Sequence, residues 1–187
     1  MKKTKFIMLL FLGISASLFA QDDELMDTDA DMMINEQLLT DATEAKEAMI
    51  KVDAKIETHF DNAYGYVVFP NVGKGALVVG AASGNGIVYE NGDVIGTANL
   101  KQLDIGLQAG GQAYREVIFF ENESSFTDFK ENDYKFAAGA SAVVLKSGKG
   151  VKAEYTDGVA VVVLPKAGLM AEAAVGGQRI SFTPAEQ

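Results

Sequence analysis

Glycine recurs inside the apolar stretches that follow residue 62, and this pattern constrains the fold more than any other feature of the sequence. The chain has 19 glycines in 187 residues, and many stand between short apolar runs such as Leu77-Val78-Val79 and Ile87-Val88-Tyr89. Glycine weakens a flat strand, but it permits bulges, sharp coiling and close packing. Residues 62–187 are therefore predicted to form a glycine-rich antiparallel β-structure with a strongly curved sheet, as in a sheet that closes toward a barrel.

Turn signals and strict alternation divide this region into strands. Asn91-Gly92 is a strong hairpin signal, because both central residues of a type I′ turn adopt a positive φ. From Gln102 to Ala113, small or apolar residues alternate with polar residues and glycine, which predicts one strand with a buried face and a polar face. The other strand candidates are the apolar, β-branched or aromatic runs at residues 64–69, 77–79, 87–89, 117–120, 136–145, 159–164, 169–175 and 180–182.

Three local signals refine this prediction. Pro70 is expected to end the first strand, since proline lacks the amide proton that a strand ladder needs. Asp157-Gly158 is expected to be a turn. Residues 122–132 are expected to form a short helix with Phe126 and Phe129 facing inward.

An acidic helical segment is predicted before the strands. Its apolar residues recur at intervals of three and four, which places them on one helical face. They are Ile34, Leu38, Ala42, Ala45, Met49, Val52, Ile56 and Phe60. Asp41 followed by Glu44 resembles a capping box, so residues 31–61 are expected to form a short helix and then a longer one over 42–60. Residues 21–30 are polar and acidic, and we expect a disordered linker there.

The first 20 residues have the composition of a secretory signal peptide. Lys2, Lys3 and Lys5 precede an uncharged apolar run, and Ala20 supplies a small residue at the cleavage point. The run is short for a membrane span, which needs about 20 apolar residues. We therefore expect cleavage after Ala20 and export to the periplasm or the extracellular space; an uncleaved N-terminal anchor is the minor alternative. Because the chain has no cysteine, packing without disulfides must stabilise the exported protein.

The charge of the chain argues against one class of partner. The formal net charge is −10, and removal of the three N-terminal lysines makes it more negative. The stretch Asp22–Asp61 holds half of the 26 acidic residues, whereas acids and bases are nearly balanced after it. Nucleic acid is not expected as a partner, because phosphate binding needs clustered lysine and arginine.

Residues that could hold a metal ion are sparse in the sequence. The one histidine, His59, has no second histidine or cysteine with which to form a metal site. Residues 27–31 start like a calcium loop, but Met32 and Leu38 stand where such a loop needs glycine and glutamate. No metal site and no cofactor are predicted.

Motifs for catalysis are equally weak. No serine lies in a G-x-S-x-G elbow, and Gly73-Lys74-Gly75 and Gly148-Lys149-Gly150 lack the residue order of a phosphate-binding loop. Any two of the 26 acids could meet in space as a glycosidase pair, but no pair stands out. The sequence favours a protein that is not an enzyme, with a hydrolase as the minor alternative.

Three segments between residues 62 and 182 resemble the lipid-binding SYLF domain family. The first is Phe69-Pro70-Asn71-Val72-Gly73-Lys74-Gly75, followed by Gly84-Asn85-Gly86-Ile87-Val88. The second is Ile105-Gly106-Leu107-Gln108-Ala109-Gly110-Gly111-Gln112, followed by Val117-Ile118-Phe119-Phe120. The third is Pro165-Lys166-Ala167-Gly168-Leu169-Met170-Ala171-Glu172-Ala173, ending at Gly176-Gly177-Gln178-Arg179-Ile180. The order and spacing of the segments carry the resemblance.

The resemblance implies an α+β fold, in which N-terminal amphipathic helices pack on a strongly curved, barrel-like antiparallel β-sheet as a single SYLF-like domain. It also implies association with lipid and no catalysis. Lys74 is the matched basic residue that would contact a lipid headgroup; its alternative role is to close a Lys-Gly turn. Eukaryotic members resemble proteins that reach anionic membranes with a basic N-terminal segment. The acidic segment here would be repelled, so phosphoinositide binding is not carried over.

Two hypotheses for function follow. In the first, the chain is a non-catalytic lipid- or hydrophobic-ligand-binding protein of the bacterial cell envelope, with a lipid or membrane surface as its partner. In the second, it is a structural or interaction protein that docks on another envelope protein through the apolar face of its acidic helix, without binding lipid. The location of that apolar face, in the core or on the surface, separates the two.

Overall fold

The computed structural model describes residues 23–75, 79–105, 112–131, 134–136, 141–146, 153–167 and 173–185. The chain divides into two units, Met1–Asn35 and Glu36–Gln187. The second unit contains the whole sheet. The expected signal peptide lies outside the described residues.

Three helices are described, namely α1 (Asp23–Val52), α2 (Ile56–Asn62) and α3 (Glu123–Glu131). α1 begins inside the stretch 21–30 that was expected to be a disordered linker, so residues from Asp23 on are helical instead. Acidic side chains are favourable in the first turn of a helix, because the helix dipole is positive there. α3 confirms the short helix predicted from the sequence, with Phe126 and Phe129 both buried.

The helices are interrupted at Asp53 and not at Asp41, where the break was predicted. Asp41 lies inside α1, and its Oδ1 accepts a hydrogen bond of 2.7 Å from Gln37 Nε2 one turn earlier. Asp53 Oδ1 accepts a hydrogen bond of 3.1 Å from the Lys55 amide, just before α2 begins at Ile56. A short carboxylate that binds a nearby backbone amide favours a turn over a continued helix, which accounts for the position of the break.

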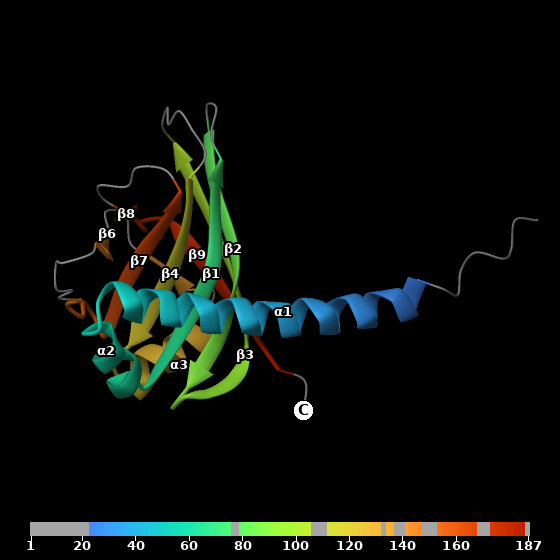
Figure 1. Ribbon diagram of the computed structural model, residues 1–187, viewed down its shortest axis with the longest axis horizontal. Helices are drawn as coiled ribbons and strands as arrows, with labels where there is room; N and C mark the ends of the chain where they lie inside the picture. Colours follow the sequence, from blue (N-terminus) through green and yellow to red (C-terminus); the bar gives the residue numbers. More distant parts are fainter. Residues whose placement is uncertain are drawn as a thin grey trace, which may run out of the picture. The chain divides into compact units, whose positions relative to one another are not determined.

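In the part of the chain that the structure describes, nine strands form one sheet in the order β5-β9-β3-β2-β1-β4-β7-β6-β8. They are β1 (Gly65–Gly75), β2 (Val79–Glu90), β3 (Asp93–Ile105), β4 (Gln112–Phe120), β5 (Tyr134–Lys135), β6 (Ser141–Val144), β7 (Val159–Ala167), β8 (Ala173–Ala174) and β9 (Gln178–Pro184). Neighbouring strands are antiparallel except β6 and β7, which are parallel. The sheet curls into a half-barrel (Figure 1), which confirms the predicted α+β fold.

Both faces of the half-barrel are covered by helices. On the outer face, α2 and the part of α1 from Glu36 on lie across β1, β4 and β7 (Figure 1). Ala42 and Met49 of α1 are fully buried there. On the inner face, α3 packs Phe126 and Phe129 against the aromatic and aliphatic side chains of the sheet. The apolar face of the helical segment from residue 42 on is therefore core.

Pro70 lies within β1 and does not end it. The pairing register of β1 shifts between Phe69 and Val72 on the side of β4, and between Val68 and Gly73 on the side of β2. A bulge can hold proline, because a bulged residue leaves the hydrogen-bonding ladder. The prediction that the strand ends here was wrong for that reason.

The alternating run from Gln102 to Ala113 is divided between two strands. β3 ends at Ile105 and β4 begins at Gln112, and residues 106–111 lie outside the described residues. Glycine fits a strand and a connection equally well, so the alternation in the sequence did not show this division.

The predicted turns and the predicted close packing are both present. Asn91 and Gly92 have φ values of 51° and 91°, as a type I′ hairpin requires. A Cβ on Gly86 in β2 would lie 2.7 Å from Phe69 Cδ1 and 2.8 Å from the carbonyl oxygen of Val68. Glycine at this position lets an aromatic ring of β1 pack directly on the neighbouring strand.

Candidate functional site

A cluster of polar side chains is buried in the interior of the half-barrel. Glu116 on β4 and Gln178 on β9 are fully buried, and Gln102 on β3 is 2% exposed. Gln178 Nε2 donates a hydrogen bond to Glu116 Oε2 at 3.1 Å and a longer one to Gln102 Oε1 at 3.4 Å. Gln102 Nε2 donates to the carbonyl oxygen of Gly176 at 3.3 Å. β4 and β9 are separated by three strands in the sheet, so the contact between Glu116 and Gln178 crosses the concave interior.

Two oxygens of this cluster have no partner among the described residues, namely Glu116 Oε1 and Gln178 Oε1. Burial raises the pKa of Glu116 from 4.5 to about 7, and the hydrogen bond from Gln178 opposes this rise. No charge on a described residue contributes to the shift. The carboxyl is therefore poised to exchange its proton near neutral pH, which is unusual for a glutamate.

The two ends of the half-barrel differ in chemistry. The pairing register brings together, at one end, the termini of five strands. These terminal residues are Gly75, Val79, Ile105, Gln112 and Ala167. We call this the loop end. At the opposite end, Gly65 pairs with both Glu90 and Phe120, and we call it the acidic end.

The connections that emerge at the loop end are poor in charge. Their sequences are Ala-Leu-Val at residues 76–78, Gly-Leu-Gln-Ala-Gly-Gly at 106–111 and Gly-Leu-Met-Ala-Glu at 168–172. Glu172 is thus the one charged residue of the three. These segments lie outside the described residues, but the strands on either side of them place their attachment points at the loop end.

Three cations lie side by side on the outer face of the sheet near the loop end. Lys101 on β3 is opposite Arg179 on β9, and Arg179 is opposite Lys135 on β5. All three residues are exposed, and none forms an ion pair with another described residue. Neighbouring strands are about 4.8 Å apart, and like charges directly opposite each other destabilise a sheet. We call these three residues the basic row.

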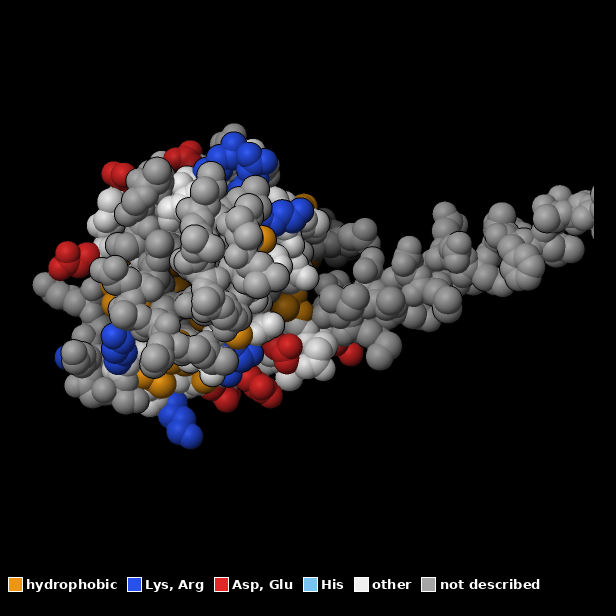
Figure 2. Space-filling model, turned by 90° about the horizontal axis from the view of Figure 1, so that it is seen from above, with side chains coloured by type: hydrophobic (Ala, Val, Ile, Leu, Met, Phe, Trp, Pro, Cys, Tyr) orange, Lys and Arg blue, Asp and Glu red, His pale blue; other side chains and the backbone are white. Residues whose placement is uncertain are grey.

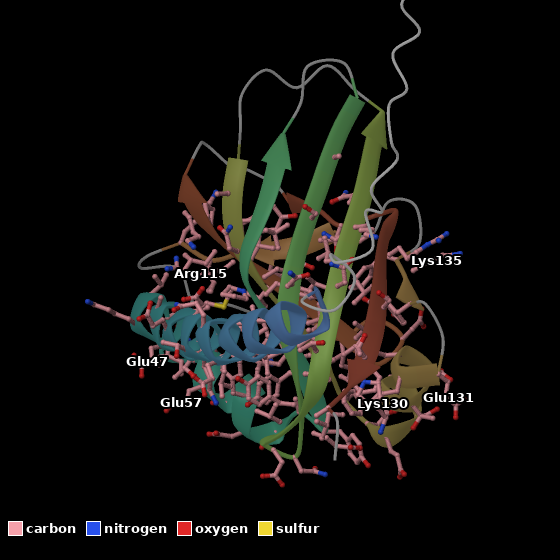
Figure 3. All side chains as sticks on the ribbon, turned by 90° about the vertical axis from the view of Figure 1, so that its right-hand side faces the viewer. Glu47, Glu57, Arg115, Lys130, Glu131 and Lys135 are labelled. Atoms are coloured by element: carbon pink, nitrogen blue, oxygen red, sulfur yellow. The ribbon has the colours of Figure 1, made fainter. Side chains whose placement is uncertain are left out.

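Charge is separated along the half-barrel beyond the basic row. The loop end also carries Arg115 and Lys166, whereas the acidic end carries exposed carboxylates. These are Asp93, Glu121, Glu123 and Asp157. Figure 3 shows the labelled Arg115 and Lys135 near mid-height of the half-barrel, farther from the acidic end than Glu57 and Glu131. The one labelled base at the acidic end, Lys130, is paired with Glu90 at 3.1 Å.

The view onto the loop end shows basic side chains around much of its rim, together with some acidic ones (Figure 2). Basic residues beside charge-poor apolar segments form the combination that an anionic, apolar interface attracts.

Lys74, the predicted headgroup contact, lies on β1 near the loop end. Its backbone is paired with Ala82 on β2 and with Gln112 on β4. Lys74 is therefore part of a strand and not of a turn, and its side chain lies outside the described residues. Its role in lipid contact stays a prediction.

Sequence reasoning missed both the basic row and the buried cluster. Alternation placed Gln102 on a polar face, but this face looks into the protein and not into solvent. Glu116 directly precedes a run of four apolar residues, 117–120, and that isolated acid beside a core strand was the available signal. Lys101, Lys135 and Arg179 are far apart in the chain, so only the strand pairing unites them.

His59, the one histidine of the chain, packs against aromatic rings. Its ring centroid is 5.6 Å from that of Phe119 and 6.2 Å from that of Tyr155. The described residues contain no group of three or more side chains that could hold a metal ion. Within the same residues, no helix has both the length and the apolar character that a membrane span requires.

No protein-family model matches the chain. The chain is similar to Beta cell expansion factor A of Aeromonas veronii, with 28% identity over 166 residues. The alignment covers 80% of this chain and 62% of the relative, so the chain spans less than two thirds of that protein.

Proposed function

We propose that this chain is a non-catalytic lipid-binding protein of the bacterial cell envelope, which contacts an anionic lipid surface with its loop end. One observation carries the proposal: the basic row lies at the same end of the half-barrel as three charge-poor connections. Cations attract anionic headgroups, and apolar segments gain free energy at the acyl boundary. The resemblance to the SYLF family points to the same function.

The basic row supports this proposal because its arrangement destabilises the free protein. Three cations in lateral register, with no ion-pair partner among the described residues, repel one another, and oppositely charged neighbours would have been more stable. The repulsion disappears when an anionic surface supplies the missing counter-charge. The acidic end and the acidic helix would be repelled by that surface, so charge alone selects the loop end for contact.

Contact at the surface is a better proposal than a ligand cavity. The described interior is filled with core side chains, among them Phe69, Tyr114, Phe120, Phe126 and Phe129. The docking alternative, in turn, required the apolar face of the acidic helix as a partner surface. That face is buried from residue 42 on, so this part of it is not free to dock on a partner.

Flotation with vesicles tests the proposal. The protein is prepared from Gln21 on, because the apolar N-terminal segment would insert into vesicles by itself. This protein still contains every residue that the structure describes. We expect binding to phosphatidylcholine vesicles that contain phosphatidylglycerol, weak binding to phosphatidylcholine alone, and loss of binding as salt is raised. Absence of binding to both vesicles at low salt would overturn the proposal.

A matched pair of double variants locates the contact. Lys101→Gln with Arg179→Gln removes two charges from the basic row, whereas Lys51→Gln with Lys55→Gln removes two exposed charges from the helical segment. A cation near an anionic surface is worth about 1 kcal/mol, so the first variant is expected to weaken partitioning roughly 30-fold. The second is expected to change it little. An equal loss in both variants would contradict contact through the basic row.

A further inference from the structure

β3 and β9 form two cross-strand pairs that are adjacent along both strands, one pair on the inner face of the sheet and the other on the outer face. Gln102 is opposite Gln178 on the inner face, and Lys101 is opposite Arg179 on the outer face. Successive side chains of a strand point to opposite faces. A movement of these two strand segments that displaces the buried glutamines therefore also displaces Lys101 and Arg179, two of the three residues of the basic row.

Glu116 is the group that reaches these segments from the far side of the interior. Its Oε2 accepts the hydrogen bond from Gln178 Nε2 at 3.1 Å, although β1, β2 and β3 lie between β4 and β9 in the sheet. The contact thus adds to the ladder hydrogen bonds a direct connection between two distant strands. It connects β4, in the middle of the sheet, to β9, which among the described residues is paired only with β3 and the two-residue strand β5.

The surroundings of Glu116 favour the neutral form of its carboxyl. Its neighbours in register are Phe69 on β1 and Val163 on β7, and Tyr114 precedes it on the same face of β4. Tyr114 is the titratable residue nearest along that face of β4, and no charge on a described residue contributes to the pKa shift of Glu116. Gln178 presents both an amide donor and an unpartnered oxygen to the cluster. An ionised carboxylate would keep one hydrogen bond and lose all solvation.

We propose that the contact between Glu116 and Gln178 is a proton-dependent latch, which holds β9 and β3 in the position that aligns the basic row and releases them when Glu116 loses its proton to solvent. This inference rests on the proposed function, since it names the regulation of that same surface. Burial and the raised pKa of Glu116 support a release near neutral pH. Below that range the latch is closed and the row is aligned. Above it, the carboxylate gains free energy by leaving the apolar interior.

The first arm of the test measures lipid binding of the protein from Gln21 on. Partitioning onto phosphatidylcholine vesicles containing phosphatidylglycerol is measured at pH 6 and at pH 8, where the phosphodiester and most surface carboxylates stay ionised. The wild type is expected to bind about fivefold more weakly at pH 8, the equivalent of one lost cation contact. Glu116→Gln, which stays neutral at both values, is expected to bind equally at both.

The second arm measures the effect of the latch on the protection of β9 in the absence of lipid. Amide hydrogen-exchange protection factors, corrected for the intrinsic pH dependence of exchange, are compared at pH 6 and pH 8. Protection in β9 is expected to fall at pH 8 in the wild type and to stay constant in Glu116→Gln, whereas protection in β1 stays constant in both. If Glu116→Gln fails to fold, Gln178→Met replaces it, because removal of the amide donor must also abolish the pH response.

The outcomes test the latch and the proposed lipid-binding function separately. The same pH response in wild type and variant, or constant protection of β9 in the wild type, overturns the latch. Failure of the wild type to bind the vesicles that contain phosphatidylglycerol at pH 6 overturns the proposed function, and hydrogen exchange alone then tests the latch. A pH response in both arms that depends on Glu116 supports it.

Discussion

Gln178 and Arg179 are adjacent in β9, yet Gln178 is fully buried and hydrogen-bonded to Glu116, whereas Arg179 is exposed beside Lys101 and Lys135. The alternation of a strand thus connects a titratable interior to a charged exterior across a single peptide bond. Both sides of this arrangement reduce the stability of the free protein, because one buries a carboxyl and the other opposes like charges. Such local losses of stability are typical of sites that serve a function.

Stability should depend on pH through Glu116. Below pH 4.5 the carboxyl is protonated in both the folded and the unfolded chain, and between 4.5 and about 7 only the unfolded chain loses the proton. The free energy of unfolding should therefore fall by roughly 3 kcal/mol as the pH rises through this window, and then level off. Urea denaturation at a series of pH values measures the fall. Glu116→Gln should lack this component, and an unchanged pH profile in the variant would contradict the assignment.

Glycine should be required at Gly86 and replaceable at Gly73, although both lie in strands. A Cβ at Gly86 would come within 2.7 Å of Phe69 Cδ1, whereas a Cβ at Gly73 meets nothing within 4 Å. We expect Gly86→Ala to lower the free energy of unfolding by about 1–3 kcal/mol, the range for an overpacked core. Gly73→Ala should leave stability unchanged or raise it slightly. Thermal denaturation of both variants compares them directly, and equal losses would argue against close packing.

Local signals predicted the fold where the cause of a structure was itself local. Asn91-Gly92 adopts the positive φ values that its turn needs, and Phe126 and Phe129 are buried at helical spacing. The chain continues through Pro70, however, because the pairing of β1 with strands on both sides allows a bulge. That pairing joins residues far apart in the sequence, and no local pattern reveals it.

The candidate site could not be predicted from the sequence for the same reason. Lys74 was predicted because it belongs to a contiguous motif, and its role in lipid contact stays a prediction. The basic row depends on the register of three strands, and the contact of Glu116 with Gln178 depends on the curvature of the sheet. Register and curvature are properties of the assembled sheet, so they cannot be recognised from the order of the residues in the sequence.

The turn between α1 and α2 should depend on Asp53 and not on Asp41. Asp53 Oδ1 binds the Lys55 amide in the break, whereas Asp41 binds a glutamine side chain on the helix surface. Replacement of a residue that caps a backbone amide typically lowers stability by about 1 kcal/mol, and loss of an exposed side-chain contact by a few tenths. Asp53→Ala and Asp41→Ala remove the same group, so urea denaturation of the two variants tests the location of the break. A larger loss in Asp41→Ala would restore the break predicted from the sequence.

The acidic helix should be a structural part of the half-barrel unit. Met49 is fully buried against the outer face of the sheet, whereas Leu39 in the same helix is 40% exposed. Met49→Ala should lower the free energy of unfolding by about 2–5 kcal/mol, because a buried side chain leaves a cavity behind. Leu39→Ala serves as the control on the same helix and should change stability by less than about 1 kcal/mol. If Met49→Ala left stability intact but abolished capture of an envelope partner, the helix would be a docking element, and the lipid surface proposed here would lose its place as the main contact.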